Sequence, residues 1–167
     1  MTTTQARTTD EIAIRELYEQ LMDGWNRGSG VAFAEVFTEE GDLVAFDGTH
    51  LEGRAQIEAV QQRLFDKYLK GTRLVGTVER VRFLDQDTAV MHAVGNTIMR
   101  GKTRPSPERA SIQTLTTVRR DGVWRIAAFQ NTRVRPIGRN GLTFLVWTFG
   151  DLLWRILRLD TSTTPMR

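Results

Sequence analysis

The sequence predicts an α+β fold, with helices first and an antiparallel sheet after them. Between residues 9 and 70, apolar residues recur every three or four positions in three segments, which is the spacing of one helix face. From residue 73 to residue 135, runs rich in Val, Ile, Thr and aromatic residues are separated by turn residues, the pattern of a four-stranded meander. At 167 residues, the chain has the length of one such domain.

The first helix is predicted to begin at Thr8, which has capping-box spacing with Glu11. Its apolar face carries Ile14, Leu17, Leu21 and Trp25. Gly28 follows and ends the helix, since glycine readily adopts the left-handed conformation of a helix stop. Residues 1–8 are Thr-rich, lack the apolar stretch of a secretory signal and are expected to be disordered.

Two further helices are predicted. Ser29 suits the N-cap of a short helix in which Phe33 and Phe37 lie one turn apart. The third helix is predicted over residues 54–70, with Gly71 as its stop. Its expected buried stripe consists of Ile57, Val60, Leu64 and Tyr68.

The strands are marked by their turns. Residues 42–46 are predicted to form a short strand that turns at Asp47-Gly48 and returns at His50 and Leu51. The four long strands are predicted over 73–84, 88–99, 110–119 and 123–135. Asp121-Gly122, between the last two, is the strongest hairpin signal in the chain. A proline-containing basic loop, residues 100–109, joins the middle pair.

The last segment differs from the rest. Residues 141–159 are apolar almost all round, with a narrow polar seam formed by Asp151, Arg155 and Arg158. The part from 141 to 157 is shorter than the roughly 20 residues of a comfortable membrane span. We therefore expect a domain over 9–135 and a C-terminal extension, 136–167, with an amphipathic helix. That helix would dock on its own domain or across a dimer, contact a membrane surface through 141–157, or form a lid over a ligand.

The composition excludes several kinds of catalytic and metal-binding site. The chain is 40% hydrophobic and 26% charged, which is ordinary for a soluble globular protein. It has no cysteine, so disulfides, thiolate nucleophiles and cysteine-ligated metals are excluded, and a reducing, cytoplasmic location is expected. The two histidines, His50 and His92, have no metal-ligand spacing, and no flavin or nicotinamide motif follows a strand. We expect no metal and no cofactor.

Charge is distributed unevenly along the chain. Residues 1–99 contain 10 Lys/Arg and 16 Asp/Glu, whereas residues 100–167 contain 13 and 4. A basic half can attract nucleic acid or an anionic membrane. No nucleic-acid-binding motif accompanies it, so solvated surface arginines are the simpler interpretation and no nucleic-acid partner is expected.

The order of these elements resembles the nuclear transport factor 2-like, or SnoaL-like, superfamily. Within it, the chain is most similar to the SgcJ/EcaC family. The resemblance is carried by WNRG (25–28), LVAFDGTHLEGR (43–54), LKGTRLVG (69–76), SIQTL (111–115) and WRIAAFQNTRV (124–134), and covers about residues 9–135. It implies a cone-shaped curved antiparallel sheet with three N-terminal helices around a central pocket, and a homodimer formed through the convex sheet face. Some members of this family occur with polyketide pathways.

Asp47 is the first candidate catalytic residue. Ketosteroid isomerase shares the superfamily, and the resemblance places Asp47 close to its proton-abstracting Asp. The oxyanion-binding positions of that enzyme fall near Leu21 and near Gln113 or Thr114, so they do not carry over. An Asp-Gly pair between apolar runs is also simply a turn. A catalytic role needs the Asp47 carboxylate to lean into an apolar cavity, where desolvation raises its pKa.

The second candidate is His92, which shares one strand face with Asn96 in period-2 alternation. If that face is concave, these two would be polar groups in an apolar cone, as in ligand sites; otherwise His92 is a hydrogen-bonded structural residue. The other candidate pocket residues are Trp25, Tyr18, Gln113, Gln130 and His50. Trp25 is core or pocket wall, the two glutamines have structural hydrogen bonding as the alternative, and His50 is expected in a turn or at the pocket mouth.

Three kinds of function remain open from the sequence. The first is a cofactor-independent isomerase, cyclase or dehydratase acting on a hydrophobic, polyketide- or polyene-like substrate. In that case Asp47 would be the general base, and His92 or Gln113 would bind the oxyanion. The second is a protein that binds a small lipophilic molecule without chemistry, as an accessory protein in secondary metabolism. The third is assembly, as a homodimeric module or at a membrane surface.

Overall fold

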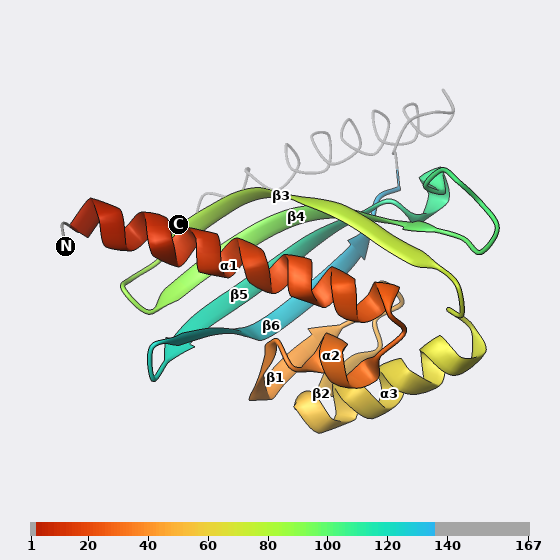
Figure 1. Ribbon diagram of the computed structural model, residues 1–167, viewed down its shortest axis with the longest axis horizontal. Helices are drawn as coiled ribbons and strands as arrows, with labels where there is room; N and C mark the ends of the chain where they lie inside the picture. The colour runs from red at the N-terminus through yellow and green to blue at the C-terminus, as the bar shows by residue number, and fades with distance from the viewer. Residues whose placement is uncertain (1–2, 136–167) are drawn as a thin grey trace, which may run out of the picture. The chain divides into compact units, whose positions relative to one another are not determined.

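Four long antiparallel strands form the body of a curved sheet in the computed structural model, which describes residues 3–135 (Figure 1). They are β3 (Arg73–Phe83), β4 (Thr88–Ile98), β5 (Ser111–Arg120) and β6 (Val123–Arg133). The predicted meander is confirmed. At the β5–β6 turn, Asp121 and Gly122 have φ of 52° and 76°, the left-handed conformation that a two-residue hairpin turn requires.

A short hairpin extends the sheet beyond β6. It consists of β1 (Phe37–Val44) and β2 (His50–Glu52), and the full order is β2-β1-β6-β5-β4-β3. The predicted antiparallel sheet is confirmed for the four long strands and the β1–β2 hairpin, whereas β1 runs parallel to β6. A parallel neighbour is possible because β1 and β6 are distant in the chain and no tight turn constrains their relative direction. With β2 and β3 at its edges, the sheet is open.

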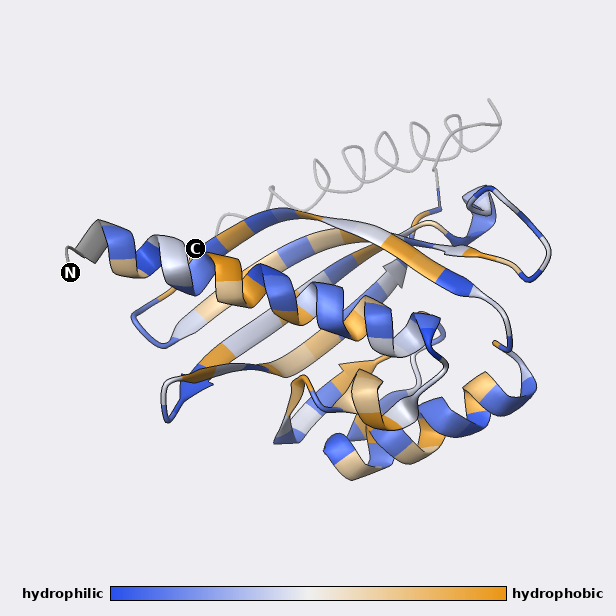
Figure 2. Cartoon of the chain, in the orientation of Figure 1, coloured by the Kyte–Doolittle hydropathy of each residue, from blue (hydrophilic) through white to orange (hydrophobic). Residues whose placement is uncertain are grey.

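The helix α1 (Thr3–Asn26) packs its apolar side against the sheet (Figure 2). Ile14, Leu17 and Leu21 are buried, which confirms the predicted stripe. The helix begins at Thr3, five residues before the expected start, so Thr8 is inside it. The guanidinium of Arg7 lies 5.9 Å from the centre of the Phe83 ring, a tertiary contact that local capping signals could not reveal.

The other two helices also differ from the prediction in detail. Ser29 caps α2 (Gly30–Ala34) by accepting a hydrogen bond from the Ala32 N–H, as expected, but the helix is short and Phe37 begins β1 instead. In α3 (Arg54–Lys67), the buried residues are Ile57, Gln61 and Phe65. Tyr68 is 65% exposed, because the helix ends at Lys67 before this side chain can join the stripe.

The core lies between the sheet and the helices. An aromatic cluster formed by Trp25, Phe33, Phe37 and Phe65 joins the three helices to β1, with ring centres 5.5 to 6.3 Å apart. Such tilted and edge-on ring pairs stabilise the fold by more than the burial of their apolar area alone. No helix within residues 3–135 has the length and apolar character needed to cross a membrane. The expected C-terminal helix and the extension 136–167 lie outside the described residues.

Candidate functional site

The sheet has an inner face toward the helices and an outer face away from them. On β4, Ala89, Met91, Ala93, Gly95 and Thr97 are buried in alternation, whereas His92 and Val94 are exposed; Ile98, at the end of the strand, is also buried. On β5, Ser111, Gln113 and Leu115 are buried and the residues between them are exposed or nearly so. The two faces are therefore assigned by burial, and polar groups on the inner face are the candidates for a site.

Tyr18 and Gln113 form a hydrogen bond inside this core. The Tyr18 hydroxyl donates to Gln113 Oε1 at 2.6 Å, and both side chains are at most 2% exposed. Because α1 brings Tyr18 down onto the inner face of β5, the pair connects residues 95 positions apart in the chain. The bond also orients the Gln113 amide, directing its oxygen toward the helix and its nitrogen along the sheet.

Two more polar residues lie beside Gln113. Ser111 Oγ is 3.5 Å from Gln113 Nε2 and donates a hydrogen bond to the Gly95 carbonyl. Asn131 is directly opposite Gln113 across the β5–β6 pair. Its Oδ1 is buried and has no hydrogen-bond partner. We call Tyr18, Ser111, Gln113 and Asn131 the inner polar cluster.

Small residues make room for this cluster. A Cβ at Gly76 would overlap the Tyr18 hydroxyl, and a Cβ at Gly95 would come within 2.8 Å of Gln113 Nε2. Gly76 and Gly95 are paired across β3 and β4, so Tyr18 and Gln113 pack over neighbouring glycines of the inner face. The same strands elsewhere carry larger inward residues such as Met91 and Leu74.

Burial also decides the protonation of Tyr18. Desolvation raises the pKa of the Tyr18 hydroxyl well above its ordinary value, since the phenolate would be costly away from water. The hydroxyl therefore stays a proton donor throughout the physiological range. A neutral donor held in an apolar interior can bind a developing oxyanion, though here it is already engaged by Gln113.

Asp47 lies elsewhere. It is exposed in the turn between β1 and β2, where its Oδ1 accepts a hydrogen bond from the Thr49 N–H at 3.0 Å. This hydrogen bonding lowers the pKa of Asp47. The expectation of a carboxylate leaning into an apolar cavity with a raised pKa is wrong, because the Asx turn directs the side chain back onto its own loop.

The strand face that carries His92 and Asn96 is not the inner face of the sheet. His92 is exposed on the outer face, with Nδ1 3.5 Å from Thr114 Oγ1. Asn96 lies on the same outer face, and its Oδ1 accepts a hydrogen bond from the Thr97 N–H. Gln130 is also exposed on the outer face, opposite Thr114. None of the three points into the core, since alternation along each strand directs them away from it.

The two remaining candidates, His50 and Trp25, both reach the surface of the protein. His50 is exposed on β2, 3.4 Å from Asp42 Oδ1. Trp25 is half-buried, and its Nε1 donates to Thr72 Oγ1. With Phe65 and Leu69 it lines a surface pocket of about 390 Å³ between the ends of α1 and α3, so it is both core and pocket wall.

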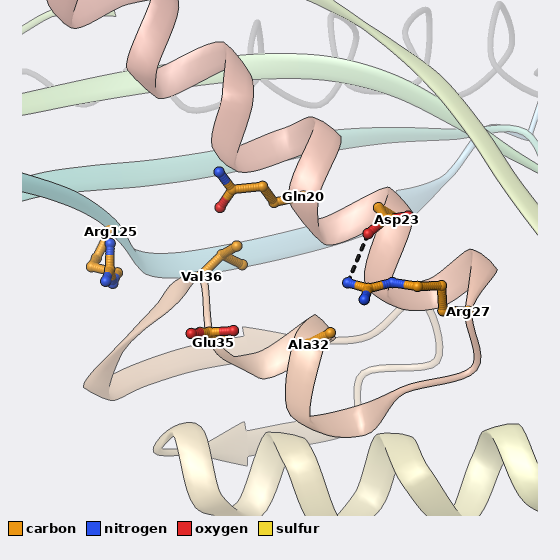
Figure 3. Close-up of a pocket in the computed structure, with 7 residues that line it drawn as sticks. All are labelled: Gln20, Asp23, Arg27, Ala32, Glu35, Val36 and Arg125. Atoms are coloured by element: carbon orange, nitrogen blue, oxygen red, sulfur yellow. Dashed lines mark ion pairs between the residues drawn. The ribbon is translucent and has the colours of Figure 1, made fainter.

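A second surface pocket, of about 220 Å³, lies between α1, α2 and the start of β6 (Figure 3). Gln20, Glu35 and Arg125 line it, together with the Asp23–Arg27 ion pair at 2.7 Å. Its charges are paired or solvated, and it holds no unsatisfied buried group among those described. Within residues 3–135, no group of three His, Asp or Glu side chains is arranged to hold a metal ion.

Sequence reasoning placed Tyr18 and Gln113 among the candidates but not together, and it missed Asn131. A β-bulge explains the miss. Thr117 pairs with Ile126 but Thr116 pairs with Ala128, so Ala127 is an extra residue in β6. A regular hairpin counted back from the Asp121-Gly122 turn would have placed Gln130 opposite Gln113. The bulge turns Gln130 outward and Asn131 inward.

The SnoaL-like domain family matches residues 6–130. The chain belongs to the SnoaL-like domain family. No curated protein matches it. This SnoaL-like protein is similar to a domain of unknown function with a cystatin-like fold from Nostoc punctiforme, at 37% identity over 97% of this chain and 98% of that one, with a TM-score of 0.76.

Two structures named as enzymes share the fold at lower identity. A type 2 hexachlorocyclohexane dehydrochlorinase is 17% identical, with a TM-score of 0.64 over 80% of this SnoaL-like chain and 90% of its own. A candidate scytalone dehydratase from Novosphingobium aromaticivorans is 19% identical, with a TM-score of 0.64 over 83% and 99%. At these identities the likeness establishes the curved α+β fold.

Proposed function

We propose that this SnoaL-like protein binds a small, mostly apolar molecule through a hydroxyl group held at the inner polar cluster. The surrounding core supplies the apolar surface: Leu43, Leu115 and Phe129 are buried on the same face of the sheet. A few polar groups converging in an apolar interior are the usual composition of small-molecule sites.

The observation that carries this proposal is the unpaired Asn131 Oδ1. A buried carbonyl oxygen without a partner costs about 1–3 kcal/mol, so such atoms are rare unless a ligand or water completes them. Gln113 Nε2, across the strand pair, has donor capacity beyond its long contact to Ser111. A neutral hydroxyl can donate to Asn131 and accept from Gln113 at once, whereas a carboxylate has no donor for Asn131 at neutral pH.

The test combines ligand capture with a matched pair of variants. Native mass spectrometry of the purified protein should show a bound small molecule, which is then identified and titrated back. Asn131→Leu should weaken its binding by about tenfold or more, the value of one lost hydrogen bond in a buried site. Gln130→Leu, one residue along on the exposed outer face, should leave binding within about twofold.

The proposal fails if both variants bind equally well. It also fails if no small molecule is captured and a crystal structure shows an ordered water on Asn131 Oδ1, because a buried water then completes the cluster.

A cofactor-independent isomerase, cyclase or dehydratase is the second candidate. The fold likeness to a dehydrochlorinase and to a candidate scytalone dehydratase supports it, and so does Tyr18, whose pKa is raised by burial so that its neutral hydroxyl could donate a hydrogen bond to an enolate. Such a reaction needs a base, and Asp47 is placed in solvent. Exchange of ligand C–H protons for deuterium in the presence of protein would reveal turnover; complete absence of exchange supports binding alone.

We also propose that the chain falls within the SgcJ/EcaC group of the SnoaL-like proteins, on the segments 25–28 and 124–134. The occurrence of that group with polyketide pathways makes an apolar, oxygenated polyketide the first compound class to test. Forms with a hydroxyl group should bind more tightly than keto forms or analogues without that oxygen, because only a hydroxyl can donate a hydrogen bond to Asn131 Oδ1.

A further inference from the structure

Two adjacent glutamines on α3 differ in how their side-chain amides are hydrogen-bonded. Gln62 is bonded through both of its polar atoms: Oε1 accepts from the Gly30 N–H at 2.7 Å, and Nε2 donates to Asp66 Oδ1 at 3.0 Å. Gln61 is 5% exposed, and its Nε2 is buried with no hydrogen-bond partner within residues 3–135. A buried donor left unpaired destabilises a fold, so such groups are rare. The fold therefore explains Gln62 but not Gln61.

The Gln61 side chain belongs to the buried face of α3. It lies one helical turn from Ile57 and one turn from Phe65, which are both buried. The Phe65 ring is edge-on to the rings of Trp25 and Phe33, with ring centres 5.5 and 6.3 Å apart. The amide thus lies on an apolar face, where a methionine would pack without leaving a polar group unpaired.

The faces of α3 and β6 that carry Gln61 and Asn131 border the same core. α3 packs over β1 and β2 (Figure 1). In these strands, Leu43 is directly opposite Leu51 of β2 and Phe129 of β6, and all three belong to the buried core. Asn131 follows Phe129 by two residues, so alternation places both on one face of β6. An unpaired donor on α3 and an unpaired acceptor on β6 therefore face one apolar interior.

We propose that Gln61 is the second polar contact of the bound molecule, and that its Nε2 donates a hydrogen bond to a carbonyl oxygen. The inference rests on the proposed function, in which Asn131 Oδ1 accepts from a hydroxyl group. It narrows the ligand class to apolar molecules that carry a hydroxyl at one position and a carbonyl at another. Because a carbonyl oxygen cannot donate to Asn131, the two contacts also fix which end of the molecule faces the helix.

The first test needs no ligand. Methionine has nearly the length of glutamine but no amide, so Gln61→Met removes the unpaired donor. The melting temperature of the ligand-free protein should then rise by about 2–4 °C. Gln62→Met, the matched control, breaks two formed hydrogen bonds and should lower it. An unchanged or lower melting temperature for Gln61→Met would overturn the inference, because Gln61 would then have a structural partner.

The second test measures binding of three related probes by calorimetry, at a pH where their hydroxyl is neutral. A hydroxytetralone carries both oxygens, on opposite rings; the matching tetrahydronaphthol lacks the ketone; and the matching tetralone lacks the hydroxyl. Losing the ketone should weaken binding to the original protein by about tenfold, the value of one buried hydrogen bond. Gln61→Met should bind the hydroxytetralone and the tetrahydronaphthol within about twofold of each other, whereas Gln62→Met should keep the original preference.

The outcomes separate this inference from the proposed function. If the original protein binds the hydroxytetralone and the tetrahydronaphthol equally, and both more tightly than the tetralone, the hydroxyl contact stands and the Gln61 contact is overturned. If the hydroxyl gives no advantage over the tetralone, the proposed function fails. A preference for the ketone that survives in Gln61→Met would also overturn the inference, since another donor would then bind that oxygen.

Discussion

The Tyr18 hydroxyl lies 2.6 Å from Gln113 Oε1, and this buried hydrogen bond connects α1 to the inner face of β5. Removing one partner leaves the other unsatisfied, so Tyr18→Phe and Gln113→Leu should each lower the free energy of unfolding by about 1–3 kcal/mol. The double variant should lose less than the two losses combined, because no orphaned polar group remains. Urea unfolding measures all three. Strict additivity would show that the pair is not coupled, and Tyr68→Phe at the surface serves as the unaffected control.

The raised pKa of Tyr18 predicts a loss of stability at high pH. Above the ordinary tyrosine pKa of about 10, the unfolded chain releases a proton that the folded chain retains, so unfolding becomes more favourable as pH rises. The free energy of unfolding of the original protein should fall by about 1.4 kcal/mol per pH unit more steeply than that of Tyr18→Phe. Spectroscopic titration of the folded protein should show Tyr18 still protonated at a pH where an unfolded tyrosine ionises. Parallel pH curves for the two proteins would contradict a buried, protonated Tyr18.

Gly76 should not tolerate a side chain. A Cβ at this position would overlap the Tyr18 hydroxyl and lie 2.7 Å from the Val94 carbonyl. Gly76→Ala should therefore destabilise the protein by about 1–3 kcal/mol, since a packed interior cannot move aside freely. Thr77→Ala, the next residue and an exposed one, gives the matched comparison by thermal unfolding. An unchanged melting temperature for Gly76→Ala would mean that α1 does not press Tyr18 against β3.

Asp47→Asn distinguishes the turn from the catalytic interpretation. Asparagine also forms Asx turns, so unfolding free energy at neutral pH should change by less than about 0.5 kcal/mol. Ligand binding should not change, because the side chain is exposed and bonded to the Thr49 N–H. If Asp47→Asn lost turnover or binding while its stability stayed unchanged, the turn interpretation would be contradicted. Asp47 would then contact the ligand, which requires that its loop close inward when the ligand binds.

The homodimer expected from the resemblance stays a prediction. On the outer sheet face, Val94 and Ile112 are directly opposite each other and are 40% and 50% exposed. If this face is the dimer interface, Ile112→Glu should halve the mass measured by light scattering, since a buried unpaired charge opposes association. Ile12→Glu, at a 53% exposed position on α1, should leave the mass unchanged. Equal masses for both variants and the original would exclude this face.

Much of the architecture could be predicted because its signals are local. The α1 stripe of Ile14, Leu17 and Leu21, the Ser29 cap and the Asp121-Gly122 turn all follow from residues within a few positions of one another. The errors occur where tertiary contacts override these signals. Phe37 continues a helical spacing, yet it joins β1 because pairing with β6 is available. Tyr68 fits the α3 stripe but lies past the end of the helix.

By itself, the sequence determined the α+β class, the succession of helices and strands, and the choice of Tyr18 and Gln113 as polar residues worth examining. Only the tertiary structure decided which polar groups share the interior. The bulge at Ala127 turns Asn131 inward in place of Gln130. Alternation along β4 directs His92 and Asn96 to the outer face. The physical reason is that periodicity depends on near neighbours, whereas the facing of a strand depends on register with distant ones, and one extra residue reverses it.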